Sequence, residues 1–353
     1  MSGERARIAQ LSGFAASLLV HAGLRSDDAR AMADCLVFAQ SSGIDSHGLM
    51  HLPAYLNGLR RSALNPRPRF VFTAERAAAA SLDAEQAPGI LAALAASDRA
   101  SALAKQAGVG AVAVRNSGHF GVASYFVHRM LGQQQVGLVF SNASPSVAPR
   151  GGRQPLFGTN PIAAGFPRAD GQPLVIDLAS TLGSRARIRK AAAAGEEIPA
   201  DWALDAEGQP TTSAEAALQG SMQALGGAKG TLLCLLVELL CVSLSGGALG
   251  AEVRPPQDPS SQPADVSHLF LAFDPEAFGG AAALSDRVAE IAAAIESVEP
   301  VEADSPVRLP GARAAAARRE AERNGILVTP ALANALAKAR SEAAAFTHFT
   351  IGA

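Results

Sequence analysis

A strand–helix–strand unit in the first half of the chain constrains the fold more than any other feature. The β-branched run VGAVAVRN, which begins at Val109, has the composition of a strand, and Gly108 is placed to end the alanine-rich helical stretch before it. The amphipathic stretch VASYFVHRML follows, and then a second strand-like run, VGLVFSN. A helix between two strands favours a sheet that is covered by helices. We therefore predict an α/β fold.

The remaining patterns place helices at both ends of this core. Helical periodicity predicts helices at about 4–23 and 26–42, and a third that begins near Asp45 with Leu52, Tyr55, Leu56 and Leu59 on one face. Further strands are expected near 161–166 and 173–178, and helices at about 281–296, 311–323 and 330–345. We expect a helical N-terminal region over 1–70, an α/β core over 71–300 in one or two interleaved lobes, and a C-terminal helical region over 301–353 that packs back on the N-terminal lobe.

One apolar segment, TLLCLLVELLCVSLSGGALG over 231–250, is almost long enough to cross a bilayer. Glu238 lies in its middle, Gly246 and Gly247 lie near its end, and no basic flank fixes a topology. We therefore predict a fully buried core helix over 231–245 rather than a membrane span.

Charge and cysteine content narrow the range of partners. The formal net charge of the 353 residues is -2 and no basic stripe is present, which argues against nucleic acid and anionic membranes as partners and favours a small substrate. Cys35, Cys234 and Cys241 form no C-x-x-C pair, as is typical of reduced intracellular thiols. The charged start of the chain lacks the pattern of a signal peptide, so we predict a cytoplasmic protein.

The stretch GIDSHGLMH, 43–51, is the strongest candidate for chemistry. Asp45, Ser46 and His47 are neighbours in sequence and project in different directions, so they cannot form a hydrolase triad by themselves. His47 and His51 have metal-ligand spacing, but Gly48 stands where a zincin carries its Glu and no third ligand is indicated, so no metal is predicted. His47 could instead donate or accept a proton, with Ser46 orienting it. Alternatively, Ser46 caps a helix and His47 packs on its flank.

A second candidate site lies in VRNSGHFGVAS, 114–124, at the junction between the first strand and its helix. Asn116, Ser117 and His119 together with free backbone N–H groups could bind an anion or phosphate, or the segment could be an ordinary capping loop. The nearby G-x-G-x-x-A pattern at 108–113 follows a helix and precedes a strand, which is the reverse of the dinucleotide fingerprint. We therefore do not expect a Rossmann site.

Three weaker candidates come later in the chain. Thr159 and Asn160 precede a strand and could contact substrate, and Asp177 to Ser180 end another strand, where ligand groups of α/β sheets often lie. Lys229, between two glycines at the head of the apolar helix, could meet a phosphate.

Several of these segments together resemble the malate/L-lactate dehydrogenase family, a nicotinamide-dependent group that is not of Rossmann type. They are GIDSHGLMHLPAYLNGLR, VRNSGHFG, LFGTNPIAAGFP, IDLAS, IPADWALDAEGQPTT, GGAKG and RLPGARAAAARREAERNGI, and the resemblance runs from about residue 5 to 343. It implies a mixed sheet covered by helices in a non-Rossmann malate/L-lactate dehydrogenase-type fold, like that of sulfolactate dehydrogenase, with a helical N-terminal region. It also implies NADP or NAD as the cofactor, with NADP favoured, and a homodimer in which region 1–70 contributes the catalytic histidine and dimer contacts.

Members of this family reduce 2-oxo acids or oxidise 2-hydroxy acids, and one branch reduces the cyclic imines Δ1-pyrroline-2-carboxylate and Δ1-piperideine-2-carboxylate to proline and pipecolate. PLFGTNPIAAGFP and FLAFDPEAF are closer to the imine-reducing branch, so the leading expectation is an imine reductase of proline metabolism. A 2-hydroxy-acid dehydrogenase, malate- or L-lactate-like, is the second expectation. A catalytically degenerate dimer that binds a nucleotide or a small acid is the third.

The resemblance also implies roles for individual residues. Ser46 and His47 belong to the proton-donating pair, and in other branches the position of His119 is the acid–base. The implied substrate contacts are His51, Thr159 and Tyr55, and the implied cofactor contacts are His119, Phe120, Gly121, Val122, Ala123, Asp177, Leu178, Ala179, Lys229, Arg308 and Arg313.

Two departures from the family pattern bear on the site. His51 stands where the family often has an Arg that clamps the substrate carboxylate. Arg187 stands where the imine branch has an Asp that partners the catalytic histidine and the dehydrogenase branch has a Lys. An Arg there is expected to lower the pKa of a nearby imidazole.

Overall fold

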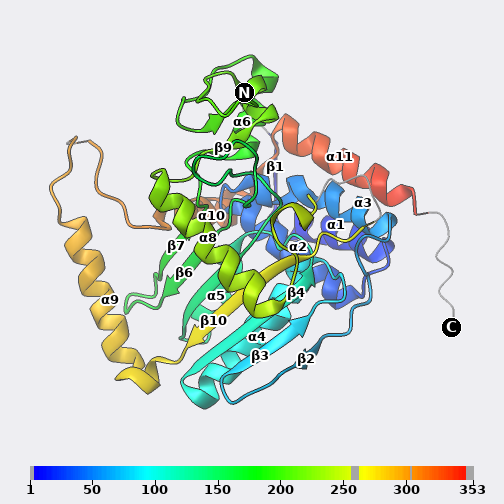
Figure 1. Cartoon of the computed structure of the whole chain (residues 1–353). Coiled ribbons are helices and arrows are strands. Elements are labelled where there is room, and N and C mark those ends of the chain that lie inside the picture. The colour runs from blue at the N-terminus through cyan, green and yellow to red at the C-terminus, as the bar shows by residue number, and fades with distance from the viewer. Residues whose placement is uncertain (1–3, 256–261, 303, 347–353) are drawn as a thin grey trace, which may run out of the picture.

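The computed structural model of the chain describes residues 4–255, 262–302 and 304–346 (Figure 1). The remaining residues are 1–3, 256–261, 303 and 347–353, so the outer ends of the predicted 1–70 and 301–353 regions lie outside the described residues.

A mixed sheet forms the centre of the molecule. Within the described residues its seven strands follow the order β2-β3-β4-β10-β5-β6-β7. They are β2 (Val71–Thr73), β3 (Ala79–Asp83), β4 (Val109–Ser117), β10 (Val266–Phe273), β5 (Val136–Ser141), β6 (Ile162–Phe166) and β7 (Leu174–Leu178). Only the β3–β4 pair is parallel among these strands. The predicted α/β class with a mixed sheet is therefore confirmed.

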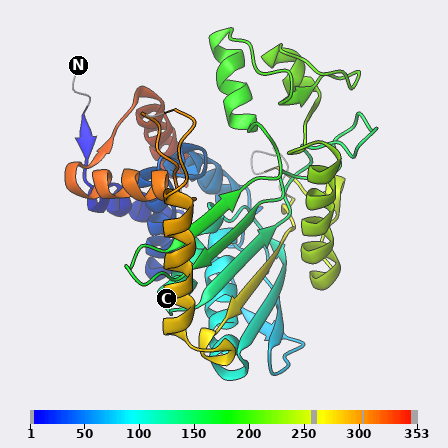
Figure 2. The ribbon, with the colours of Figure 1, turned by 90° about the vertical axis from the view of Figure 1, so that its left-hand side faces the viewer.

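Helices α4 (Gly89–Ala107) and α5 (Ala123–Leu131) cover one face of this sheet, as Figure 2 shows. Helix α4 lies on β4 and β10, and α5 lies on β5 and β6. Gly110 of β4 permits this close packing, because a Cβ built there would lie 2.0 Å from the carbonyl oxygen of Ala100. The strand–helix–strand prediction is confirmed by β4, α5 and β5.

The two ends of the chain form one helical layer beside the sheet. The N-terminal elements are α1 (Ile8–His21), α2 (Ser26–Ser41), the 3-10 turns Asp45–His47 and Leu49–His51, and α3 (Leu52–Arg60). The C-terminal elements are α10 (Ala312–Asn324), β11 (Ile326–Leu327) and α11 (Pro330–Ala344). Strand β11 pairs with β1 (Arg5–Ala6), and α11 packs on α3 and α1. The exact division into three regions stays a prediction.

A small lobe stands at one end of the sheet (Figure 2). It contains α6 (Arg185–Ala194), β8 (Ala203–Leu204), α7 (Ala214–Gln219) and β9 (Ser221–Met222). The lobe has its own apolar core, in which Ile188, Ile198 and Met222 are buried. Helix α9 (Ala281–Glu296) runs along the left edge of the molecule in Figure 1.

The prediction of a fully buried helix over 231–245 is wrong. Helix α8 (Ala228–Glu238) and the π-helical turn Leu239–Ser243 pack on the uncovered face of the sheet through Val237 and Cys241, whereas Cys234 packs into the core of the small lobe. The opposite side is exposed, with Leu232 at 64%, Leu236 at 48% and Leu239 at 52% of their full accessible surface. Because both sides of this helix are apolar, the sequence carried no periodicity that could separate them. Within the described ranges, no helix is long and apolar enough to span a membrane.

Candidate active site

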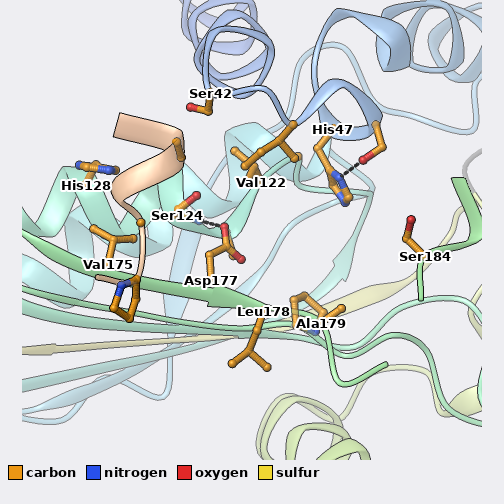
Figure 3. Close-up of a pocket in the computed structure, with 18 of the residues that line it drawn as sticks. Ser42, His47, Val122, Ser124, His128, Val175, Asp177, Leu178, Ala179 and Ser184 are labelled. Atoms are coloured by element: carbon orange, nitrogen blue, oxygen red, sulfur yellow. Dashed lines mark hydrogen bonds between the residues drawn. The ribbon is translucent and has the colours of Figure 1, made fainter. Parts of the chain in front are cut away.

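A cavity of about 860 Å³ lies where the N-terminal turns, the sheet, the small lobe and α10 meet. Figure 3 shows its elongated form, with His47 and Ser184 at one end and Val175 and the start of α10 at the other. Asp177, Leu178 and Ala179 at the end of β7 form its floor. The cavity therefore combines segments from both ends and the middle of the chain.

The loop between β4 and α5 carries His119 and is held from two sides. Gly89 begins α4 directly against it, and a Cβ built on Gly89 would lie 2.0 Å from the carbonyl oxygen of Gly118. On the other side, His268 of β10 forms a hydrogen-bonded bridge between two serine hydroxyls. Its Nε2 lies 2.9 Å from Ser117 Oγ, and its Nδ1 lies 2.8 Å from Ser141 Oγ. Burial lowers the pKa of His268 to about 3, so this bridge is neutral.

Three imidazoles gather at one end of the cavity. The ring centroids are 4.5 Å apart for His51 and His119, 5.5 Å for His47 and His119, and 6.1 Å for His47 and His51. Burial lowers the pKa of all three, and their mutual repulsion lowers the pKa of His51 and His119 further; that of His51 falls to about 4. The cluster is therefore neutral near pH 7.

Hydrogen bonds distinguish the roles that these rings can play. His119 Nδ1 lies 3.3 Å from the backbone nitrogen of Gly121 and 2.9 Å from Tyr55 Oη. Because the Gly121 N–H can only donate, Nδ1 accepts, and the hydrogen of neutral His119 is assigned to Nε2. His47 Nδ1 lies 3.0 Å from Ser46 Oγ. Ser46 lies inside the turn Asp45–His47, whose N-cap is Ile44, so the alternative that Ser46 serves as a helix cap is wrong.

Asp177 is the carboxylate whose negative charge changes the pKa of His47. Its Oδ2 accepts a hydrogen bond from the Ser124 N–H at 3.0 Å, and burial raises the pKa of this carboxyl. The negative charge of Asp177 raises the pKa of His47, against the larger lowering effect of burial. The expectation that Arg187 would act on an imidazole is wrong, because its guanidinium carbon lies 5.8 Å from the Trp202 ring and it does not line the cavity.

The structure brings most of the predicted site residues together. Those that line the cavity are Ser46, His47, His51, His119, Phe120, Gly121, Val122, Ala123, Thr159, Asp177, Leu178, Ala179, Arg308 and Arg313. Tyr55 lies behind His119, in a small neighbouring cavity. Lys229 is exposed at the start of α8 and is not part of the lining. The sequence interpretation missed Arg185 and Arg189, which also line the cavity.

Comparison with known proteins assigns the chain to a family. A family model described as malate/L-lactate dehydrogenase matches residues 6–337. The chain belongs to this family. It is 40% identical over 311 residues to the (2R)-3-sulfolactate dehydrogenase (NADP(+)) of Chromohalobacter salexigens, and the match covers 87% of this chain and 89% of that protein. It is 33% identical over 271 residues to Delta(1)-pyrroline-2-carboxylate reductase 1 of Burkholderia ambifaria, where the match covers 77% and 80%.

The fold agrees with this assignment to the malate/L-lactate dehydrogenase family. The solved structure of sulfolactate dehydrogenase from Methanocaldococcus jannaschii superposes with a TM-score of 0.90 at 30% identity, covering 97% of this chain and 98% of that chain. The protein is an NAD(P)-dependent oxidoreductase, as the resemblance implied.

The cavity suits the cofactor of the malate/L-lactate dehydrogenase family. Its volume is in the range of cofactor sites, and the end near α10 carries Arg308, Arg313 and Arg319, whose charges match those of phosphate groups. In the described part of the chain, no cluster of three or more His, Cys, Asp or Glu side chains is arranged to hold a metal ion.

Proposed function

We propose that this protein interconverts a small 2-hydroxy acid and the matching 2-oxo acid with NADP or NAD, with NADP favoured. The observation that carries the proposal is that His47 and Asp177 line one cavity with two further neutral imidazoles, and that the charge of Asp177 raises the pKa of His47. The names of the relatives, which include sulfolactate and malate dehydrogenases, support this reaction class.

His47 is the proposed acid–base. Its lowered pKa leaves the imidazole neutral near pH 7, which is the form that can accept the proton of a 2-hydroxyl group. If Nδ1–H donates to Ser46 Oγ, the Nε2 lone pair is free to take that proton. The negative charge of Asp177, which lines the same cavity, then stabilises the imidazolium that forms. The nicotinamide, when bound, accepts the hydride from C2 of the substrate.

His119 has a different proposed role. Its Nδ1 is occupied by Tyr55 and by the Gly121 N–H, and its Nε2 carries the hydrogen. In this state it can donate a hydrogen bond to a substrate oxygen but cannot accept a proton at Nε2. Together with Thr159, which also lines the cavity, it would orient the substrate.

Reduction of a cyclic imine, the leading expectation from the sequence motifs, is the second candidate. It is favoured by two relatives of this chain, from Burkholderia ambifaria and Burkholderia multivorans, that are named Delta(1)-pyrroline-2-carboxylate reductases. This reaction needs protonated His47 to supply a proton to nitrogen. Because burial lowers the pKa of His47, that form is scarce near pH 7, which favours oxidation of a hydroxyl group instead.

One assay separates the two reactions. Nicotinamide absorbance is followed with sulfolactate, malate and L-lactate in the presence of NADP or NAD, and with Δ1-pyrroline-2-carboxylate in the presence of the reduced cofactors. We expect the highest kcat/KM with a 2-hydroxy acid. A higher kcat/KM with the imine would replace the first candidate by the second, and no turnover with any substrate would favour the catalytically degenerate dimer.

We also propose that the protein is a cytoplasmic homodimer, an assembly that the family resemblance implies. The exposed leucine face of α8, formed by Leu232, Leu236 and Leu239, supports self-association because a second copy would present a matching apolar surface. Leu236→Glu is expected to shift the sedimentation coefficient to that of a monomer. An unchanged dimer would place the interface elsewhere, and a monomeric wild type would refute the assembly.

A further inference from the structure

Two arginines of the small lobe face the histidine end of the cavity. Arg185 and Arg189 are four residues apart on α6, so their side chains lie on the same side of this helix. Both line the cavity, together with Ser184 and Thr181. Arg187 lies between them in sequence and packs on Trp202 instead.

These two positive charges have no acidic partner. In residues 4–255, 262–302 and 304–346, no carboxylate forms an ion pair with either guanidinium. Arg185 Nη2 donates to the carbonyl oxygen of Leu218 at 3.3 Å, which leaves its charge uncompensated. Burial lowers the pKa of Arg185, and the charge of Arg189 lowers it further. Two like charges in one cavity are stabilised when an anion binds between them.

The position of Arg189 points to the substrate. Arg189 and His51 line the same cavity, and the charge of Arg189 lowers the pKa of His51. His51 itself is neutral near pH 7, because its pKa falls to about 4, so it cannot supply the charge that binds an anionic substrate. The acidic residues of the lining other than Asp177 are Glu296 on α9 and Glu322 on α10, and neither contributes to the pKa of Arg185 or His51.

We propose that Arg189, assisted by Arg185, binds a second anionic group of the substrate, a sulfonate or carboxylate on C3, so that the protein selects 2-hydroxy acids with two negative charges. The inference rests on the proposed function. Two uncompensated guanidinium groups beside neutral imidazoles match a substrate of charge -2 better than one of charge -1.

The test compares Arg189→Gln with a control on the adjacent residue. Lys190→Gln removes the same charge from an exposed residue that does not line the cavity. For Arg189→Gln we expect the Michaelis constant for sulfolactate to rise about tenfold or more, with that for L-lactate changed less than about threefold. Lys190→Gln should change neither, and Arg189→Lys should recover only part of the loss because it lacks the bidentate fork. The thermal unfolding midpoint of each variant checks that it folds.

Two outcomes would overturn the proposal. An equal rise in the Michaelis constants for sulfolactate and L-lactate would mean that Arg189 binds the carboxylate on C1, which both substrates share. A rise in the Michaelis constant for NADP alone would mean that it binds a cofactor phosphate.

A binding measurement separates this inference from the proposed reaction. The unreactive dianion 3-sulfopropanoate lacks the hydroxyl group, so calorimetry can follow its binding without turnover. We expect wild type and Lys190→Gln to bind it, and Arg189→Gln to bind it about tenfold more weakly or worse. Failure of wild type to oxidise any hydroxy acid would refute the reaction, whereas equal affinity of wild type and Arg189→Gln for this dianion would refute the anion site.

Discussion

Replacement of His47 by Ala tests the central chemical step. The substitution removes the one imidazole of the cluster whose pKa a neighbouring carboxylate raises. No other ring can take over the proton: His119 Nδ1 already accepts from the Gly121 N–H and lies beside Tyr55 Oη, and His51, with a pKa of about 4, is a weak base. We therefore expect kcat for hydroxy-acid oxidation to fall about 10²-fold or more, which corresponds to about 2.7 kcal/mol or more in the barrier.

The assay measures kcat and kcat/KM for the best hydroxy acid over pH, together with the Kd of the cofactor by fluorescence titration. The Kd should stay within about threefold of wild type, because a general base contributes to the reaction barrier rather than to cofactor affinity. His119→Gln is the matched control, since glutamine keeps a donor at this site, and its kcat should fall less. A kcat of His47→Ala within about threefold of wild type, or a larger loss in His119→Gln, would refute the assignment.

The pH profile gives an independent check on the same step. Oxidation needs neutral His47, so activity should be lost as pH falls through the pKa of this residue, which lies below 6.5. Asp177→Asn removes the charge that raises this pKa, so the midpoint of the profile should move to lower pH. A midpoint that stays in place or moves to higher pH would show that Asp177 does not act on His47.

Other predictions concern packing and acid stability. Gly89→Ala should lower kcat about tenfold or more, because its Cβ would lie 2.0 Å from the carbonyl oxygen of Gly118 and displace the loop that carries His119; wild-type kcat would contradict this. Gly13→Ala, in a helix with nothing within 4 Å of its Cβ, should raise the free energy of unfolding by about 0.5–1 kcal/mol in urea titrations, and a decrease would contradict the packing. Half-buried histidines such as His51, with a pKa lowered from 6.5 to about 4, leave the fold most stable above pH 6.5, and this stability is lost as pH falls from 6.5 towards 4. The free energy of unfolding should therefore decrease by about 1.4 kcal/mol per pH unit for each such histidine, and equal stability at pH 7 and pH 5 would contradict this.

The sequence was sufficient to predict elements whose two sides differ in polarity. Leu52, Leu56 and Leu59 of α3 are buried as their spacing predicted, and the strand–helix–strand unit is present where its residue types placed it. Helix α8 could not be predicted in the same way, because its exposed side carries leucines while its buried side includes the charged residue Glu238. Helical periodicity in a sequence indicates that one side of a helix is more polar than the other. In α8 the exposed side is not the more polar one, so this pattern is missing.

The candidate site could be predicted as separate motifs but not as an arrangement. The motifs around His47, His119 and Asp177 were each recognisable in sequence, yet their mutual positions depend on contacts between distant segments. His47 and Asp177 line the same cavity although they are 130 positions apart in the sequence and no local rule connects them. Arg189 carried no sequence signal at all, since one arginine in a helix with several others is ordinary until the structure shows which of them line the cavity.

The pairing of β1 with β11 has a consequence for how the protein is made. Helix α10 forms one wall of the cavity and lies close to the C-terminus, and β11, which follows it, joins the first strand of the chain. A nascent polypeptide in which the sheet and the three imidazoles have been synthesised, but α10 has not, lacks this wall of the cavity. Any affinity for cofactor that depends on this wall is therefore gained only after α10 has been synthesised and β11 has paired with β1.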